Sequence, residues 1–172
     1  AEEGTALAIV ALLFAPAAVL VDQLFAAPPW YLRVATLSGV VAAILQSLGL
    51  MRWPLLVPIL ANVWTDGEAT PAHKDAAEVV FEGAHRYLGG IGGHLAALLA
   101  AVWTILVALA ILETHLVSSW LAGFGVIAAV GLIVGVLEEA NLKWAAVIGE
   151  AATLLWSIWL IALGARILFL HM

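Results

Sequence analysis

Five apolar stretches, each long enough to cross a lipid bilayer as a helix, constrain the fold of this chain of 172 residues. A hydrocarbon core about 30 Å thick needs roughly 20 mostly apolar residues in a helix that rises about 1.5 Å per residue. The stretches cover residues 5–25, 33–51, 90–112, 116–137 and 144–170. The sequence therefore predicts an all-α integral membrane bundle of about five transmembrane helices, with residues 1–172 forming a single domain.

The composition agrees with a membrane protein. Hydrophobic residues make up 65% of the chain and charged residues only 10%, whereas about 25% of the residues in soluble domains are charged. The absence of cysteine excludes disulfides and thiolate chemistry. With 6 Lys and Arg against 12 Asp and Glu, the chain lacks a basic stripe for phosphates, which argues against a nucleic-acid partner. We expect the lipid bilayer to be its main contact.

The connection between the second and third stretches is the longest and most polar. Over residues 71–88, apolar residues recur every three or four positions, which predicts an amphipathic helix. This helix is expected to lie at the membrane interface or to extend the third span into water. Pro54 and Pro58 interrupt what would otherwise be one long second helix. We therefore expect an interfacial or partly re-entrant turn over residues 53–64.

Basic residues are shared unequally between the two predicted membrane faces. One face collects Arg52, Lys74, Arg86 and Lys143, and the other collects Arg33 and Arg166. The positive-inside rule makes the richer face cytoplasmic and puts the N-terminus on that side. Because the chain starts Ala-Glu-Glu rather than with basic residues, the first stretch is expected to be a span and not a signal peptide.

Small residues at four-residue spacing follow four of the spans, a pattern that lets helix backbones approach closely in lipid. The stripes are Ala35, Gly39, Ala43 and Ser47; Gly89, Gly93, Ala97 and Ala101; Gly131 and Gly135; and Ala145, Gly149, Thr153 and Ser157. They predict a tightly packed bundle.

Polar residues collect near the predicted cytoplasmic face. Gln46 precedes Arg52 by six residues, His94 lies about a turn inside the third span, and Glu150 follows Lys143 by seven residues. At about 1.5 Å per residue, these polar groups lie roughly 6 to 11 Å below one face. Ionisable groups inside spans are costly and therefore typical of functional sites. We predict a ligand-binding cavity formed by Gln46, Arg52, Trp53, Glu82, His85, His94 and Glu150.

Several of these residues have more than one interpretation. His85 and His94 are candidate metal or haem ligands, but nine residues on one helix place them about 13 Å apart and facing opposite ways, so they cannot share one ion. Alternatively, His85 lies at the interface and His94 hydrogen-bonds a carbonyl or Glu150. Glu150 is either a proton carrier or a neutral residue that locks the bundle. Arg52 reaches either lipid phosphates or the cavity.

The segment Gly-Leu-Met-Arg-Trp-Pro-Leu-Leu-Val-Pro at residues 49–58 resembles the Gly-Leu-x-Arg-Trp-Pro-x-Leu-x-Pro stretch of a bacterial family of small multi-pass membrane proteins filed as a domain of unknown function, DUF4386. The resemblance continues at residues 81–94, 120–128 and 155–164. His94 stands where the family tends to have Glu. The resemblance implies a helical bundle in a bacterial inner membrane and supplies no reaction.

No arrangement of nucleophile, base and orienting group accompanies the polar residues. The leading hypothesis is therefore a non-catalytic membrane protein that binds a lipophilic or small ligand, or a partner subunit, at the cavity near the cytoplasmic face. The alternatives are a b-type haem or metal-cofactor protein that uses His85 or His94, and a proton-coupled carrier that uses Glu150.

Overall fold

The computed structural model describes residues 2–25, 27–140 and 142–170. Within these ranges, five helical stretches are long and apolar enough to cross a membrane. They cover Gly4–Gln23, Tyr31–Thr65, Pro71–Thr114, Ser119–Glu138 and Lys143–Phe169. The expectation of an all-α integral membrane protein with about five spans is confirmed. Such spans imply that the lipid bilayer surrounds the protein.

Most of these stretches consist of several helical segments. The first span contains α1 (Glu2–Leu12) and α2 (Phe14–Gln23), and the second contains α3 (Tyr31–Leu50), α4 (Arg52–Leu55) and α5 (Val57–Thr65). The third contains α6 (Pro71–Gly89), the π-helix η1 (Gly90–Leu95) and α7 (Ala96–Thr114). α8 (Ser119–Gly135), the 3₁₀-helix η2 (Val136–Ala140) and α9 (Lys143–Leu170) complete the bundle.

The prediction of a turn over residues 53–64 is wrong, because the chain stays helical through α4 and α5. Pro54 and Pro58 each fall in the first turn of a short helical segment, where the missing N–H has no helical partner to lose. The amide of Leu56 still donates to the carbonyl of Arg52 at 3.0 Å, and the amide of Leu60 to that of Leu56 at 3.2 Å. The prolines therefore divide the helix without turning it back.

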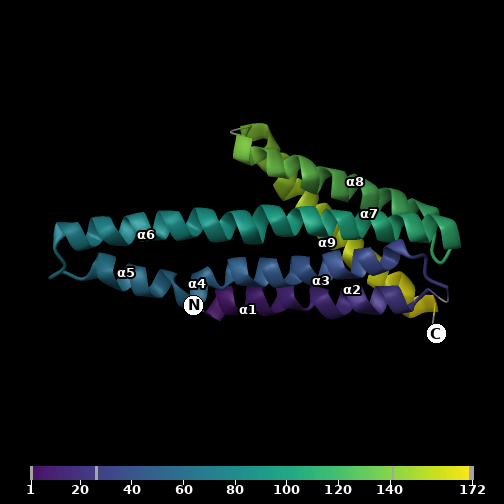
Figure 1. Cartoon of the computed structure of the whole chain (residues 1–172), viewed down its shortest axis with the longest axis horizontal. Coiled ribbons are helices and arrows are strands. Elements are labelled where there is room, and N and C mark those ends of the chain that lie inside the picture. Colours follow the sequence, from purple (N-terminus) through teal and green to yellow (C-terminus); the bar gives the residue numbers. More distant parts are fainter. Residues whose placement is uncertain (1, 26, 141, 171–172) are drawn as a thin grey trace.

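The amphipathic segment extends the third span, which was one of the two expected outcomes. α6 is capped by Thr70, whose hydroxyl accepts a bond from the amide of His73 at 3.4 Å, and it runs through η1 into α7. The second and third spans have 35 and 44 residues, or about 52 and 66 Å of helix. Both exceed a 30 Å hydrocarbon core. Residues 52–89 therefore form a helical hairpin that leaves the bundle at one end, where α5 and α6 run side by side (Figure 1).

Small residues hold the spans together, as predicted. A methyl group added at Gly39 would lie 2.7 Å from the Cβ atom of Ala18, and one added at Gly135 would lie 2.6 Å from the Cα atom of Gly149. The backbones of α8 and α9 therefore touch at Gly135, and at Gly39 the backbone of α3 packs against the small side chain of Ala18; such close approach is in lipid a main source of helix association.

The contact row on the third span differs from the predicted stripe. A methyl group at Gly93 would meet open space, whereas one at Gly92 would lie 2.5 Å from the Cα atom of Gly49. The cause is η1, because a π-helix bonds residue i to i+5 and so rotates the following turn. On α9 the row also shifts, since Ala152 is buried while Thr153 and Ser157 are exposed.

Candidate functional site

A hollow between η1, α8 and α9 brings together His94 and Glu150. It has a volume of about 200 Å³ and is also lined by Glu138 of η2. The backbone and small side chains on its walls come from Gly93, Ala97, Gly135, Ala146, Gly149 and Thr153. We call this site the α8–α9 hollow. Two residues predicted from the sequence to share a cavity therefore do line one.

Glycine shapes the α8–α9 hollow from two sides. The close approach of Gly135 and Gly149 places the adjacent Glu150 beside the end of α8. On the facing side, the π-helix η1 has the sequence Gly-Ile-Gly-Gly-His-Leu, in which glycine makes regular α-helix unfavourable. π-Helical turns inside α-helices are frequent at functional sites. Here the π-helical turn carries His94 to the hollow.

The α8–α9 hollow is lined by acidic groups. Glu138 and Glu150 contribute carboxylates, and no lysine or arginine is among the described lining residues. The hydroxyl of Thr153 donates to the carbonyl of Gly149 at 2.9 Å, so its oxygen is left to accept. Glu150 follows Lys143, the first residue of α9, by seven positions, or about 10 Å. A carboxylate at this depth favours a nearby positive charge.

Arg52, Trp53 and His85 form a second cluster, at the base of the hairpin. Nη1 of Arg52 donates to the carbonyl of Gly49 at 3.1 Å, and the guanidinium lies 5.5 Å from the centre of the Trp53 ring. The Trp53 and His85 rings are 6.0 Å apart, and His85 also lies 5.5 Å from Phe81. Arg52 thus contacts the chain itself and joins the hairpin to the end of α3.

Gln46 and Glu82 lie apart from both groups. Gln46 lines a cavity between α1, α2 and α9. Glu82 pairs with Arg86 one turn along α6, at 2.8 Å, with both side chains exposed. The expectation that Gln46, Arg52, His94 and Glu150 meet at one cavity is therefore not what the structure has. Their equal depths along the helix axes did not specify on which side of each helix they lie.

The cavity beside Gln46, here called the lateral cavity, has a volume of about 560 Å³. Phe14, Trp103 and Trp156 stack edge to face at its wall, with ring centres 4.9 Å (Phe14–Trp103) and 5.1 Å (Phe14–Trp156) apart. Trp156 also donates to the hydroxyl of Thr104 at 2.8 Å. The sequence analysis missed this cluster. The signal available in the sequence was tryptophan in the middle of predicted spans, which is unusual because membrane tryptophans concentrate at the interfaces.

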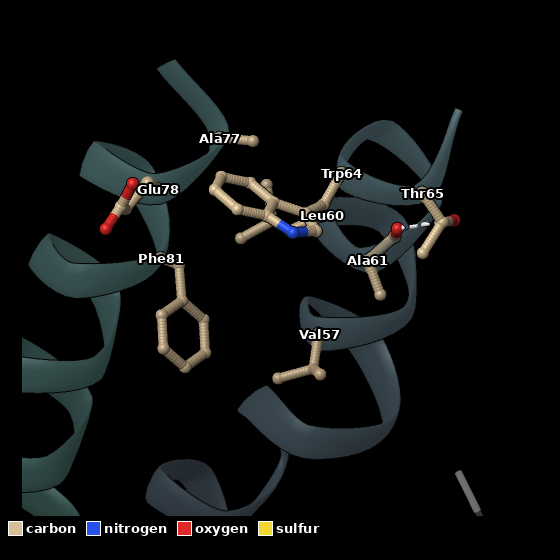
Figure 2. Close-up of a pocket in the computed structure, with 8 residues that line it drawn as sticks. All are labelled: Val57, Leu60, Ala61, Trp64, Thr65, Ala77, Glu78 and Phe81. Carbon is tan, nitrogen blue, oxygen red and sulfur yellow. Dashed lines mark hydrogen bonds between the residues drawn. The ribbon is translucent and has the colours of Figure 1, made fainter. Parts of the chain in front are cut away.

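A third hollow lies within the hairpin, between α5 and α6. It has a volume of about 320 Å³, and the rings of Trp64 and Phe81 face the space between the two helices (Figure 2). Its lining is apolar apart from Thr65 and Glu78, and the hydroxyl of Thr65 donates to the carbonyl of Ala61 at 2.9 Å. This groove adds no convergent polar groups of the kind that orient a ligand.

The histidines lie in separate places. His94 lines the α8–α9 hollow, and His85 lies between the rings of Trp53 and Phe81. Among the residues that the structure describes, no group of three or more His, Cys, Asp or Glu is placed to hold a metal ion. The 200 Å³ beside His94 is also below the range of roughly 300–1,000 Å³ typical of sites for drug-sized ligands.

A family model described as "Domain of unknown function (DUF4386)" matches residues 3–164. No curated protein matches the chain, and no solved structure does. The resemblance inferred from the Arg-Trp-Pro segment is thereby confirmed, and the function has to be argued from the geometry.

Proposed function

We propose that this chain, which belongs to the DUF4386 family, is a non-catalytic membrane protein that binds a small cationic group at the α8–α9 hollow. The observation that carries the proposal is that His94 and Glu150, from two different spans, line one hollow together with Glu138. The site takes a protonated amine, either a small molecule or the head of an amphiphile.

Charge supports this choice of ligand. Two carboxylates line the hollow, and none of its described lining residues is a lysine or arginine. Glu138 and Glu150 are both exposed, so a ligand can reach them, and an ammonium group supplies the opposite charge and the hydrogen-bond donors that a carboxylate within a membrane span needs. The volume of about 200 Å³ suits a small group better than a flat macrocycle. A b-type haem on His85 or His94 therefore has less support.

The state of the Thr153 hydroxyl, which lines the hollow, supports ligand binding more than catalysis. Thr153 already gives its proton to the carbonyl of Gly149, so it is not poised as a nucleophile activated by an adjacent base. The two glutamates beside His94 carry oxygens that accept hydrogen bonds from an ammonium group.

The experiment compares benzylammonium with its neutral counterpart benzyl alcohol, by titration calorimetry on the detergent-purified protein. Benzylammonium should bind saturably and more tightly than the alcohol. Glu150→Gln should weaken this binding about tenfold or more, because a hydrogen bond to a charged group contributes about 1.5–3 kcal/mol. Glu68→Gln, in the exposed turn of the hairpin, is the matched control and should leave the affinity unchanged.

Equal affinity for the alcohol, or an unchanged affinity in Glu150→Gln, would contradict the proposal. A second candidate, a proton-coupled carrier, draws on the same pairing of His94 with Glu150. It predicts a proton flux into proteoliposomes that Glu150→Gln abolishes and Glu68→Gln retains.

We further propose a bacterial inner membrane as the location, with the N-terminus and the hairpin on the cytoplasmic side. Support comes from the positive-inside rule, because the hairpin and the start of α9 carry Arg52, Lys74, Arg86 and Lys143. The exposed hairpin is also the part best placed to meet a partner subunit.

A further inference from the structure

The lateral cavity shares no lining residue with the α8–α9 hollow and plays no part in the proposed binding of an amine. It lies between the first span and the second half of α9. α9 packs closely along α8, and its contact with the first span is made by large side chains. The aromatic rings of Phe14, Trp103 and Trp156 act as spacers there. They leave about 560 Å³ that the bundle does not fill.

The cavity opens toward the lipid. Leu7 on α1 and Ile161 on α9 both line it, and their side chains are 56% and 72% exposed. In a membrane these side chains face the hydrocarbon core, so a ligand can enter sideways from the bilayer. The residues of the first span that line the cavity run from Leu7 to Val21, which is 14 positions or about 21 Å of helix. One leaflet of the hydrocarbon core is about 15 Å thick. An extended acyl chain therefore fits along the cavity.

Polar groups at the lateral cavity separate it from a plain lipid crevice. The amide of Gln46 lines it and supplies two donors and an acceptor. Buried donors in lipid have no water to satisfy them, so such groups are costly unless a partner is supplied. Gln46 therefore favours an occupant with a carbonyl oxygen.

We infer that the lateral cavity binds one long-chain fatty-acyl molecule, with its hydrocarbon chain between α1–α2 and α9 and its carbonyl end at Gln46. The dimensions and lining match the general form of a ligand site, which is mostly apolar and aromatic with a few polar groups that fix orientation. The chain enters from the membrane, and Gln46 determines which end of the molecule lies deeper in the site.

Gly164 offers a clean way to block this site. It lines the cavity, and a methyl group built there would meet no atom within 4 Å. Gly164→Phe should therefore fill the cavity without disturbing the bundle. Gly123 on α8 has the same open surroundings and is not among the residues that line the cavity. Gly123→Phe is thus the matched control for an added ring on a lipid-facing helix.

The test uses palmitic acid that carries a photoreactive diazirine in its chain, with the full-length protein in phosphatidylcholine nanodiscs. Labelling should be saturable, be reduced by excess palmitic acid, and map to residues 7–21 and 156–167. Gly164→Phe should reduce the specific labelling at least tenfold, and Gly123→Phe should leave it unchanged. Labelling that does not saturate, or that is equal in the two variants, would show annular lipid only and overturn the inference.

Gln46→Leu tests the orientation of the bound molecule. Loss of one hydrogen bond should weaken competition by palmitic acid about threefold to tenfold and leave competition by hexadecane, which has no carbonyl, unchanged. Equal competition by palmitic acid in the wild type and in Gln46→Leu would overturn the assignment of the carbonyl end to Gln46. Because Glu150 does not line this cavity, the Glu150→Gln variant should label normally, so this test and that of the α8–α9 hollow can fail separately.

Discussion

The indole nitrogen of Trp156 donates a hydrogen bond of 2.8 Å to the hydroxyl of Thr104, across 52 positions of sequence. Thr104 is fully buried and passes its own proton to the carbonyl of Ala100, at 2.8 Å. This chain of two bonds satisfies the indole N–H of Trp156 and the hydroxyl of Thr104 in the interior of the bundle. It also fixes α9 against α7 at the wall of the lateral cavity.

We expect Thr104→Val to lower the free energy of unfolding by about 1–3 kcal/mol, because it leaves the buried indole N–H of Trp156 without an acceptor. The measurement is reversible unfolding in mixed micelles, followed by tryptophan fluorescence. In a Trp156→Phe background, which removes the donor, the same substitution should cost measurably less. An identical cost in both backgrounds would mean that the hydrogen bond contributes nothing to stability.

A side chain at Gly135 should separate α8 from α9. Its Cβ atom would lie 2.6 Å from the Cα atom of Gly149, and backbone atoms cannot move aside as a flexible side chain does. Gly135→Leu is expected to lower the midpoint of thermal unfolding in detergent by several degrees and to weaken amine binding at the adjacent α8–α9 hollow. Gly123→Leu, in the same helix but in open space, should do neither. Equal midpoints for the two variants would contradict close α8–α9 packing.

The spans were predictable because the bilayer imposes a length and a polarity on any helix that crosses it. Helices begin near the predicted starts at residues 33, 116 and 144, namely at Tyr31, Ser119 and Lys143. Gly39, Gly131 and Gly135 were also identified correctly as contact points, since each would place an added methyl group under 3 Å from a neighbour. Close backbone approach in lipid depends on small residues, which the sequence displays directly.

The site was only partly predictable, because depth along a helix does not specify direction around it. His94 and Glu150 share a hollow, whereas Gln46 lines the lateral cavity. The π-helix altered the register of the third span, and a π turn has no simple sequence signature. Pro54 was misinterpreted as a turn because its effect depends on its place within a helix, and in the first turn of a segment that begins at Arg52 it has no helical hydrogen bond to lose.

Arg52 should hold the hairpin against the bundle. Its guanidinium donates a hydrogen bond to the carbonyl of Gly49 and lies against Trp53. It also lies close to Gly89 on α6, where an added methyl group would be 3.7 Å from Nη1. We expect Arg52→Gln to raise amide hydrogen exchange over residues 52–65 several-fold, because local opening no longer breaks these contacts. Arg86→Gln removes only an exposed ion pair and should leave the exchange rates nearly unchanged. Unaltered exchange in Arg52→Gln would assign the hairpin's rigidity to other contacts.

The absence of native cysteine makes the orientation directly testable by single-cysteine labelling. Glu68 is exposed in the turn between α5 and α6, and Ala27 is exposed between α2 and α3, at the opposite end of the bundle. With the N-terminus cytoplasmic, Ala27→Cys should react with a membrane-impermeant maleimide in intact cells, and Glu68→Cys only in inverted vesicles. The reverse pattern would place the hairpin outside, and the four basic residues Arg52, Lys74, Arg86 and Lys143 would then violate the positive-inside rule. Labelling of both positions from one side would contradict a crossing of the membrane by the second span, Tyr31–Thr65.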